Sequence, residues 1–236
     1  VDLFGQPANY EQLNKISQKY NISLIADSAQ SFGAKQRDKR VGNLTKLSTT
    51  SFFPAKPLGC YGDGGAIFSN NENISRKVKS LRNHGQGKDK YNNIRIGMNS
   101  RLDTIQAAIL IEKLKIFKKE IQLRNNAAEY YNKNLSTKVK VPEVNKNNLS
   151  VWAQYTIKVK KRKELIKFLK AKKIPYAIYY SKPNHLQKPY KDEIILPNMY
   201  ENTIYLKDHV LSLPFGPYLK KKDQDYIIKN INKFFN

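Results

Sequence analysis

The sequence has few cysteines, and it lacks long apolar runs. Its one cysteine, Cys60, excludes a disulfide within the chain and a metal site of the CxxC type. No run approaches the roughly 18 apolar residues of a membrane span, and no secretory signal pattern stands at the start. These absences predict a cytoplasmic protein from a reducing compartment, with no membrane partner.

Acidic residues are also scarce: 19 Asp and Glu face 43 Lys and Arg, giving a net charge of +24. Such a charge is compatible with a polyanionic partner such as nucleic acid. The lysines are scattered along amphipathic helical patterns such as "KLKIFKKEIQLR", and neither an aromatic-basic platform nor a helix-turn-helix pattern accompanies them. We therefore expect no nucleic-acid partner, although the charge favours anionic small substrates.

The first hundred residues alternate between helix-like and strand-like patterns. In the first helix, Leu13, Ile16 and Tyr20 share one face, and the apolar run "ISLIAD" that follows is typical of a buried parallel strand. The predicted elements are helices at 11–20 and 72–85 and strands at 22–27, 47–53 and 64–70.

A long helical pattern then covers 100–135, and its apolar residues keep a period of 3.6. The expected elements beyond Pro142 are strands at 151–159, 174–180 and 209–214 and helices at 161–173 and 220–235. The sequence thus predicts an α/β large-domain portion at 1–100, a connecting helix at 101–135 and a small α+β lobe at 136–236.

Lys56 is isolated among apolar residues and glycines in "TTSFFPAKPLGCYGDGGA". A lysine is a nucleophile only when neutral, and its ordinary pKa is about 10.4. Burial in an apolar setting lowers that pKa and prepares lysines that form Schiff bases. The alternative is a surface lysine in a glycine turn.

Asp27 ends the first predicted strand, in "IADSAQSFGA". Ligands gather at the carboxyl ends of strands in open α/β sheets, where a carboxylate can hold a positive ring nitrogen. Gln30, three residues later, points the same way if a helical turn begins at Asp27. The alternative role for Asp27 is to cap the start of a helix. An acidic group and a Schiff-base lysine are what pyridoxal phosphate requires, and Ser51 is placed to bind its phosphate.

These segments, with "RNHGQ", "GMNSRLDTIQAA", "YYSKPNHLQKPY" and "LSLPFGPYL", closely resemble the DegT/DnrJ/EryC1/StrS family over essentially the whole chain. Members of that family are pyridoxal-phosphate-dependent nucleotide-sugar aminotransferases. The resemblance implies a type I aminotransferase fold, with a partial large domain around a mixed, mostly parallel sheet and a smaller α+β C-terminal lobe.

The resemblance also implies roles toward the cofactor. Lys56 matches the lysine that binds the cofactor covalently and moves a proton between cofactor and sugar. Asp27 matches the carboxylate that keeps the ring nitrogen protonated, and Gln30 the residue packed near the ring. Ser51 matches a phosphate ligand, and Asn99 a residue that reaches the cofactor phosphate of a neighbouring subunit. A homodimer with shared active sites is therefore implied.

Arg101 and His185 match positions that approach the nucleotide-sugar. Asn184 stands where relatives usually carry leucine, so substrate contacts there can differ. The resemblance points most to UDP-linked 3-keto sugars such as UDP-2-acetamido-3-oxo-glucuronate, with glutamate as amino donor and an amino sugar for surface polysaccharide, including lipopolysaccharide, as product. Relatives that act on 4-keto-6-deoxy sugars share most of these residues.

The resemblance starts well inside the large domain, and about the first third of a typical member has no counterpart. That third carries a phosphate-binding turn, an aromatic residue on the cofactor ring and several strands. We therefore expect the chain alone to bind cofactor poorly. The alternative function is a truncated, inactive remnant, or half of a split enzyme, that acts as a binding or oligomerisation module.

Overall fold

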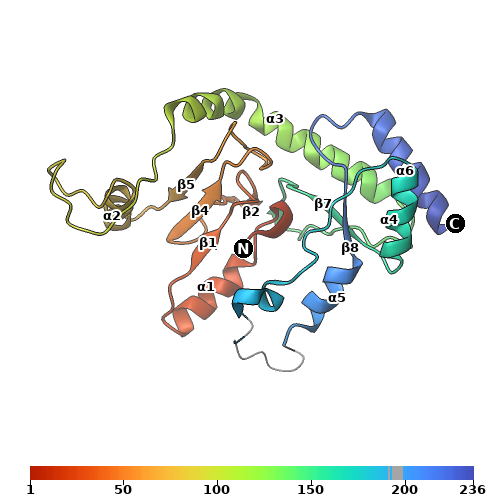
Figure 1. Ribbon diagram of the computed structural model, residues 1–236, viewed down its shortest axis with the longest axis horizontal. Coiled ribbons are helices and arrows are strands. Elements are labelled where there is room, and N and C mark those ends of the chain that lie inside the picture. Colours follow the sequence, from red (N-terminus) through yellow and green to blue (C-terminus); the bar gives the residue numbers. More distant parts are fainter. Residues whose placement is uncertain (191, 193–198) are drawn as a thin grey trace. The chain divides into compact units, whose positions relative to one another are not determined.

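The computed structural model describes residues 1–190, 192 and 199–236, and these form two compact units. Unit 1 comprises Val1–Gln122 and Val144–Ala153, and unit 2 comprises Leu123–Glu143 and Gln154–Asn236. The long helix α3 (Thr104–Asn134), labelled in Figure 1, contributes residues to both units, because the division falls between Gln122 and Leu123. The segment 144–153 groups with unit 1, whereas the sequence pattern placed it in the C-terminal lobe.

Unit 1 contains a mixed three-stranded sheet in the order β1-β4-β5 (Figure 1). Its strands are β1 (Ile25–Asp27), β4 (Leu47–Ser51) and β5 (Gly65–Phe68). β1 and β4 are parallel, and β4 and β5 are antiparallel. Each strand lies inside a range predicted from the sequence and is shorter than it.

A second small sheet in unit 1 was not predicted. It joins β2 (Lys35–Gln36), β3 (Lys39–Arg40) and β6 (Asn148–Leu149) in the antiparallel order β3-β2-β6. Its strands have two residues each, which is too short for a periodic pattern to show. This sheet ties the segment 144–153 to unit 1.

Aromatic rings form the centre of the core in unit 1. The ring of Phe32 stacks on Phe68 and Phe117, with centroids 5.9 and 5.8 Å apart, and meets Phe52 edge-on at 5.8 Å. Gly33 follows with φ +93°, and a Cβ there would lie 2.7 Å from the Phe117 ring. Only glycine fits this position, because both the backbone conformation and the close approach exclude a side chain.

The two helices of unit 1 that precede α3 begin at asparagine caps. The side chain of Asn9 accepts from Gln12 N at the start of α1 (Tyr10–Lys19), and that of Asn71 accepts from Ile74 N at the start of α2 (Glu72–Arg82). α2 was expected to run to residue 85. It ends at Arg82 because the chain turns back through left-handed residues, His84 with φ 59° and Gly85 with φ 76°.

Unit 2 packs helices around the antiparallel pair β7 (Tyr155–Lys158) and β8 (Val210–Leu213). The rings of Tyr131 and Tyr155, both fully buried, stack with centroids 4.7 Å apart at its centre. The helices are α4 (Arg162–Ala171), α5 (Glu201–His209) and α6 (Lys221–Phe235), with 3-10 turns at Leu3–Gly5 in unit 1 and at Asn184–Leu186 and Lys188–Tyr190 in unit 2.

One expectation for unit 2 was wrong, and one of its elements was missed. The range 174–180 forms no strand and contributes only an isolated bridge between Ala177 and Ser212. α5 was not predicted, since its sequence lacks a clear apolar face and nearly all of it is exposed. Among the described residues, no helix combines the length and the apolar character needed to cross a membrane.

Candidate active site

The carboxyl ends of β1 and β4 bring two candidate residues to the same edge of the sheet. Asp27 ends β1 and is the register partner of Thr49, and Ser51 ends β4 two residues later. The N–H of Ser28 continues the pairing by donating to the carbonyl of Thr49 at 2.9 Å. Because the two strands are parallel, Asp27 and Ser51 leave the sheet on one side, where ligands of open α/β sheets bind.

Lys56 lies in the loop between β4 and β5. Two backbone bonds close the base of this loop: Phe52 N–H donates to Gly64 O at 2.7 Å, and Cys60 N–H donates to Phe52 O at 2.8 Å. Lys56 N–H donates to Phe53 O at 2.9 Å, and its side chain is half-buried. These bonds give the loop a defined conformation. Lys56 lies in it five residues after Ser51, the last residue of β4.

Close backbone packing inside this loop requires glycine at position 59. A Cβ on Gly59 would lie 2.6 Å from the carbonyl oxygens of Phe53 and Pro54. The buried thiol of Cys60 donates to the carbonyl of Phe52 at 3.0 Å. Cys60 is thus a packing residue of the Lys56 loop.

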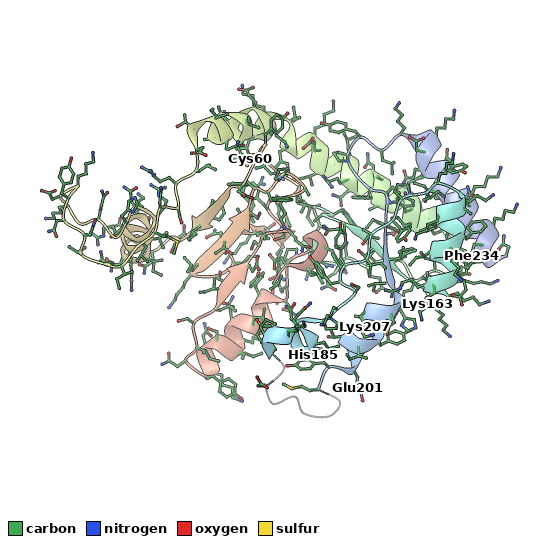
Figure 2. The ribbon with its side chains drawn as sticks, viewed as in Figure 1. Cys60, Lys163, His185, Glu201, Lys207 and Phe234 are labelled. Atoms are coloured by element: carbon green, nitrogen blue, oxygen red, sulfur yellow. The ribbon has the colours of Figure 1, made fainter. Side chains whose placement is uncertain are left out.

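Helix α3 fixes the same loop from outside, a feature that the sequence did not reveal. Gln106 Oε1 accepts from the N–H of Tyr61 at 2.8 Å, and Lys113 Nζ donates to the carbonyl of Gly59. Figure 2 shows Cys60 in the loop beside the first turns of α3. The helix therefore sets the position of the segment that carries Lys56.

The segment that carries Asp27 and Gln30 is fastened to the start of the chain. Asp27 Oδ1 accepts from Ala29 N–H at 3.1 Å, and the carbonyl of Asp27 accepts from Asp2 N–H at 2.9 Å. Gln30 Oε1 accepts from Phe4 N–H at 2.7 Å. These bonds fix the backbone that leaves β1, and a row of turns follows instead of the helical turn considered from the sequence.

A buried carboxylate supports this attachment, and no sequence pattern marked it. Asp2 is fully buried, and it accepts from Tyr10 Oη at 2.6 Å, Ser31 Oγ at 2.6 Å and Ala8 N–H at 2.9 Å. Burial, reinforced by the hydrogen bond to Asp2, raises the pKa of Tyr10 well above its ordinary value. Tyr10 therefore stays protonated at neutral pH, where it donates its hydrogen bond to Asp2.

Replacing Tyr10 with phenylalanine is expected to lower the free energy of unfolding by about 1–3 kcal/mol, because Asp2 loses a donor in a buried place. Tyr20→Phe, on an exposed side chain just after the same helix, is the matched control and should change stability little. Urea unfolding followed by circular dichroism measures both. Since the folded pKa of Tyr10 is raised, its contribution should be present at neutral pH and fall as pH rises above about 10. Equal effects of the two changes would contradict the role given to the Asp2 carboxylate.

The remaining candidates lie on other segments. Asn99 and Arg101 precede α3 in unit 1 with exposed side chains, and Asn99 Oδ1 accepts from Arg101 Nε at 3.0 Å. His185, labelled in Figure 2, belongs to unit 2. Its half-buried ring stacks on Tyr200 with centroids 4.3 Å apart. Asp27, Gln30, Ser51 and the Lys56 loop thus form the group that follows the ends of β1 and β4 in unit 1. Asn99 and Arg101 lie on the segment before α3, and His185 lies in unit 2.

The grouped side chains offer a distinct set of chemical functions. A half-buried carboxylate can hold a cationic ring nitrogen, a hydroxyl can bind an anionic oxygen, and an amine can attack a carbonyl carbon. Within residues 1–190, 192 and 199–236, no three His, Cys, Asp or Glu side chains are arranged to hold a metal ion. The set fits an organic cofactor with an aldehyde, a basic ring nitrogen and a phosphate.

Comparisons with known proteins agree on one family. Residues 1–232 match the model of the DegT/DnrJ/EryC1/StrS aminotransferase family. A curated relative from Pseudomonas aeruginosa, "UDP-2-acetamido-2-deoxy-3-oxo-D-glucuronate aminotransferase", is 44% identical over 220 residues, which are 93% of this chain and 60% of the relative.

Solved structures give the same result. A DegT DnrJ EryC1 StrS aminotransferase from Brucella abortus is 46% identical with a TM-score of 0.96, and the match covers 99% of this chain and 62% of that one. NtdA from Bacillus subtilis, solved with bound cofactor PMP, is 26% identical with a TM-score of 0.85 over 97% of this chain and 54% of that one. The chain thus spans about three fifths of the length of the first two. It belongs to the DegT/DnrJ/EryC1/StrS aminotransferase family.

Proposed function

We propose that this chain forms the major part of a pyridoxal-phosphate-dependent aminotransferase. In this proposal the enzyme converts a UDP-linked 3-keto sugar into an amino sugar, with glutamate as the amino donor, for surface polysaccharide. The observation that carries the proposal is the shared edge of β1 and β4, which holds Asp27 and Ser51 beside the loop of Lys56. The name of the Pseudomonas relative supports the choice of sugar.

The residues of the shared edge have different roles toward the cofactor. The cofactor, when bound, supplies a cationic ring that withdraws electrons from the reacting carbon. Asp27 keeps the ring nitrogen protonated, and Ser51 binds the phosphate. Lys56 would hold the cofactor through its amine until the amine of the amino donor takes its place, and the released Lys56 amine would then move a proton between cofactor and sugar. Gln30, held by the N–H of Phe4, would pack beside the ring.

The exposed candidates suit an active site shared between two copies of the protein. Asn99 extends from unit 1 and binds the cofactor phosphate of the neighbouring subunit. Arg101, hydrogen-bonded to Asn99, directs its charge toward the anionic nucleotide-sugar, and His185 contributes from unit 2. The homodimer and the cytoplasmic location belong to this proposal.

A second candidate function is a binding or oligomerisation module without catalysis. The chain spans 60% of the Pseudomonas relative, and this candidate is the function expected of that portion acting by itself. The two functions predict different behaviour when the unmatched portion of a relative is supplied.

An amino-transfer assay distinguishes the aminotransferase from the non-catalytic module. The chain is mixed with the unmatched portion of the Pseudomonas relative, pyridoxal phosphate, glutamate and UDP-2-acetamido-3-oxo-glucuronate, and the amino product is followed by mass spectrometry. We expect product from the 3-keto sugar and at least about tenfold less from a 4-keto-6-deoxy sugar, since a misplaced carbonyl loses its alignment with the amine. The reverse preference would overturn the substrate, and no product from either sugar would favour the module.

A further inference from the structure

Helix α5 of unit 2 contributes almost nothing to a hydrophobic core. None of its nine residues is buried, and its apolar side chains at Ile204, Tyr205 and Leu206 are 38%, 42% and 39% exposed. Nine residues are also fewer than the roughly 12–15 that a helix needs to be even marginally stable by itself in water. The contacts at the two ends of α5 therefore hold it in place.

The C-terminal end of α5 is fixed by a buried arginine. Arg162, the first residue of α4, donates from Nη1 to the carbonyl of Lys207 and, at 3.2 Å, to the carbonyl of Val210. The N–H of Val159 donates to the carbonyl of His209 at 2.9 Å. These bonds satisfy carbonyls that the last turn of a helix leaves without a partner inside the helix. This end of α5 is thus attached to the start of α4 and to the segment after β7.

The N-terminal end of α5 carries an unusual residue. Tyr200 is its N-cap, a position where serine, threonine, aspartate and asparagine are preferred because their side chains accept hydrogen bonds from the first turn. The side chain of Tyr200 makes no such bond. Its ring stacks instead on that of His185, with centroids 4.3 Å apart and ring planes 18° from parallel. Figure 2 labels His185 and Glu201, the first residue of α5. The residue type at the cap therefore serves the stack and not the helix.

The stack holds His185 by its face and leaves its edge available. The ring is half-buried, and no hydrogen bond within the described residues uses either of its nitrogens. An imidazole donates hydrogen bonds from the edge of its ring, where an anionic oxygen can accept them. His209 has a similar stack on Tyr205, with centroids 3.9 Å apart, but its Nδ1 is bonded to the carbonyl of Tyr205 at 2.6 Å. Of these two histidines, His185 is the one that keeps both nitrogens for another partner.

We propose that Tyr200 is a positioning residue for His185. Its ring fixes the plane of the imidazole, so that the nitrogens at the edge keep one direction and can donate to an oxygen of the anionic nucleotide-sugar. Helix α5 holds Tyr200 in that place, and Arg162 helps by fixing the far end of the helix. The identity of the ligand rests on the proposed function, whereas the stack and its effect on the His185 ring do not.

The expected benefit is affinity and not a faster chemical step. A side chain that is already held in its bound conformation spares the cost of ordering it when the ligand arrives. Without the Tyr200 ring, the His185 side chain is free to rotate, and the ligand must order it. Because His185 is not assigned to the reacting carbon, loss of Tyr200 should raise KM for the sugar and change kcat little.

Nuclear magnetic resonance of the 236-residue chain tests the stack directly. The chain has three histidines, His84, His185 and His209, so its ring Cε1–H groups give three signals. A proton that lies over the face of an aromatic ring is shifted upfield by the ring current. We expect Tyr200→Leu to move the His185 signal downfield and to leave that of His209 in place. Tyr205→Leu is the matched control and should move the His209 signal alone.

A conservative variant separates stacking from the filling of space. Tyr200→Phe keeps the ring, so the His185 signal should stay near its parent position. Relaxation of the ring carbon measures how ordered the imidazole is, and we expect this order to fall in Tyr200→Leu and to be retained in Tyr200→Phe. His185→Gln assigns the signal, and circular dichroism verifies that each variant folds.

Kinetics of amino transfer measure the consequence for the sugar. In the complex of this chain with the unmatched portion of the Pseudomonas relative, Tyr200→Leu should raise KM for the nucleotide-sugar about three- to tenfold, the size expected of one aromatic pair. The value of kcat and the KM for glutamate should change less than about twofold, because glutamate carries no nucleotide. Tyr200→Phe should restore the parent KM, and Tyr205→Leu should leave it unchanged.

Three results overturn the proposal. The first is a His185 ring that is as ordered in Tyr200→Leu as in the parent. The second is a loosened ring with an unchanged KM for the sugar. The third is a rise in KM for both substrates together, which would indicate a general loss of structure. If the parent complex forms no product while His185 loses order in Tyr200→Leu, the positioning role is supported and the proposed function is contradicted.

Discussion

Lys56→Arg is expected to abolish covalent attachment of pyridoxal phosphate to this protein. Borohydride reduction of the complex between the chain and the unmatched portion of a relative should fix the cofactor on Lys56 in the parent. In the variant, attachment at this loop should fall at least about 100-fold, because a guanidinium stays protonated and is no nucleophile. Peptide mapping by mass spectrometry measures the site and its extent.

The control must account for the many lysines of the chain, which react weakly with any aldehyde. Lys46→Arg changes an exposed lysine just before β4 and should leave the mapped site and its extent unchanged. The half-buried place of Lys56 in a loop closed by Phe52 and Cys60 is the reason for expecting one dominant site. Cofactor fixed mainly on other lysines in the parent complex would contradict the assignment.

Asp27→Asn is expected to slow amino transfer by about 100-fold, which corresponds to about 3 kcal/mol for the loss of one partner of a charge pair. An amide keeps the shape of the side chain, but it cannot hold a protonated ring nitrogen. Cofactor affinity should weaken in the same complex, and the pH dependence of cofactor absorbance should shift because the ring nitrogen loses its proton more easily.

Asp38→Asn provides the matched change, since Asp38 is an exposed aspartate in the turn between β2 and β3. It should leave rate, affinity and absorbance as in the parent. If Asp27→Asn altered stability alone, with the absorbance profile unmoved, Asp27 would be a structural residue at the end of β1 and not a cofactor ligand.

The parts of the candidate site that depend on nearby residues could be predicted from the sequence. "ISLIAD" places Asp27 at a strand end, and the glycines after Lys56 allow the close backbone packing at Gly59. The α/β class and the helix at 104–134 followed from apolar periodicity in the same way. The failures were short or weakly patterned elements, such as β2 and α5, in which tertiary contacts outweigh propensity.

The support around the site could not be predicted, because each of its bonds joins distant parts of the chain. Ser31 reaches Asp2 across 29 positions, Gln106 reaches Tyr61 across 45, and Lys113 reaches Gly59 across 54. None of these pairs produces a periodic pattern in the sequence. The residues next to a single polar side chain are the same whether or not that side chain has a distant hydrogen-bond partner.

The sequence by itself determined the residue types of the chemistry: an amine at Lys56, an acid at Asp27 and a hydroxyl at Ser51, each beside a strand end. Tertiary structure alone decided that these ends share one edge and that α3 and Asp2 hold the backbone around them. The physical reason is that hydrophobic periodicity and turn chemistry act within about ten residues. Strand order, buried hydrogen bonds and unfilled apolar surface exist only after the chain has closed on itself.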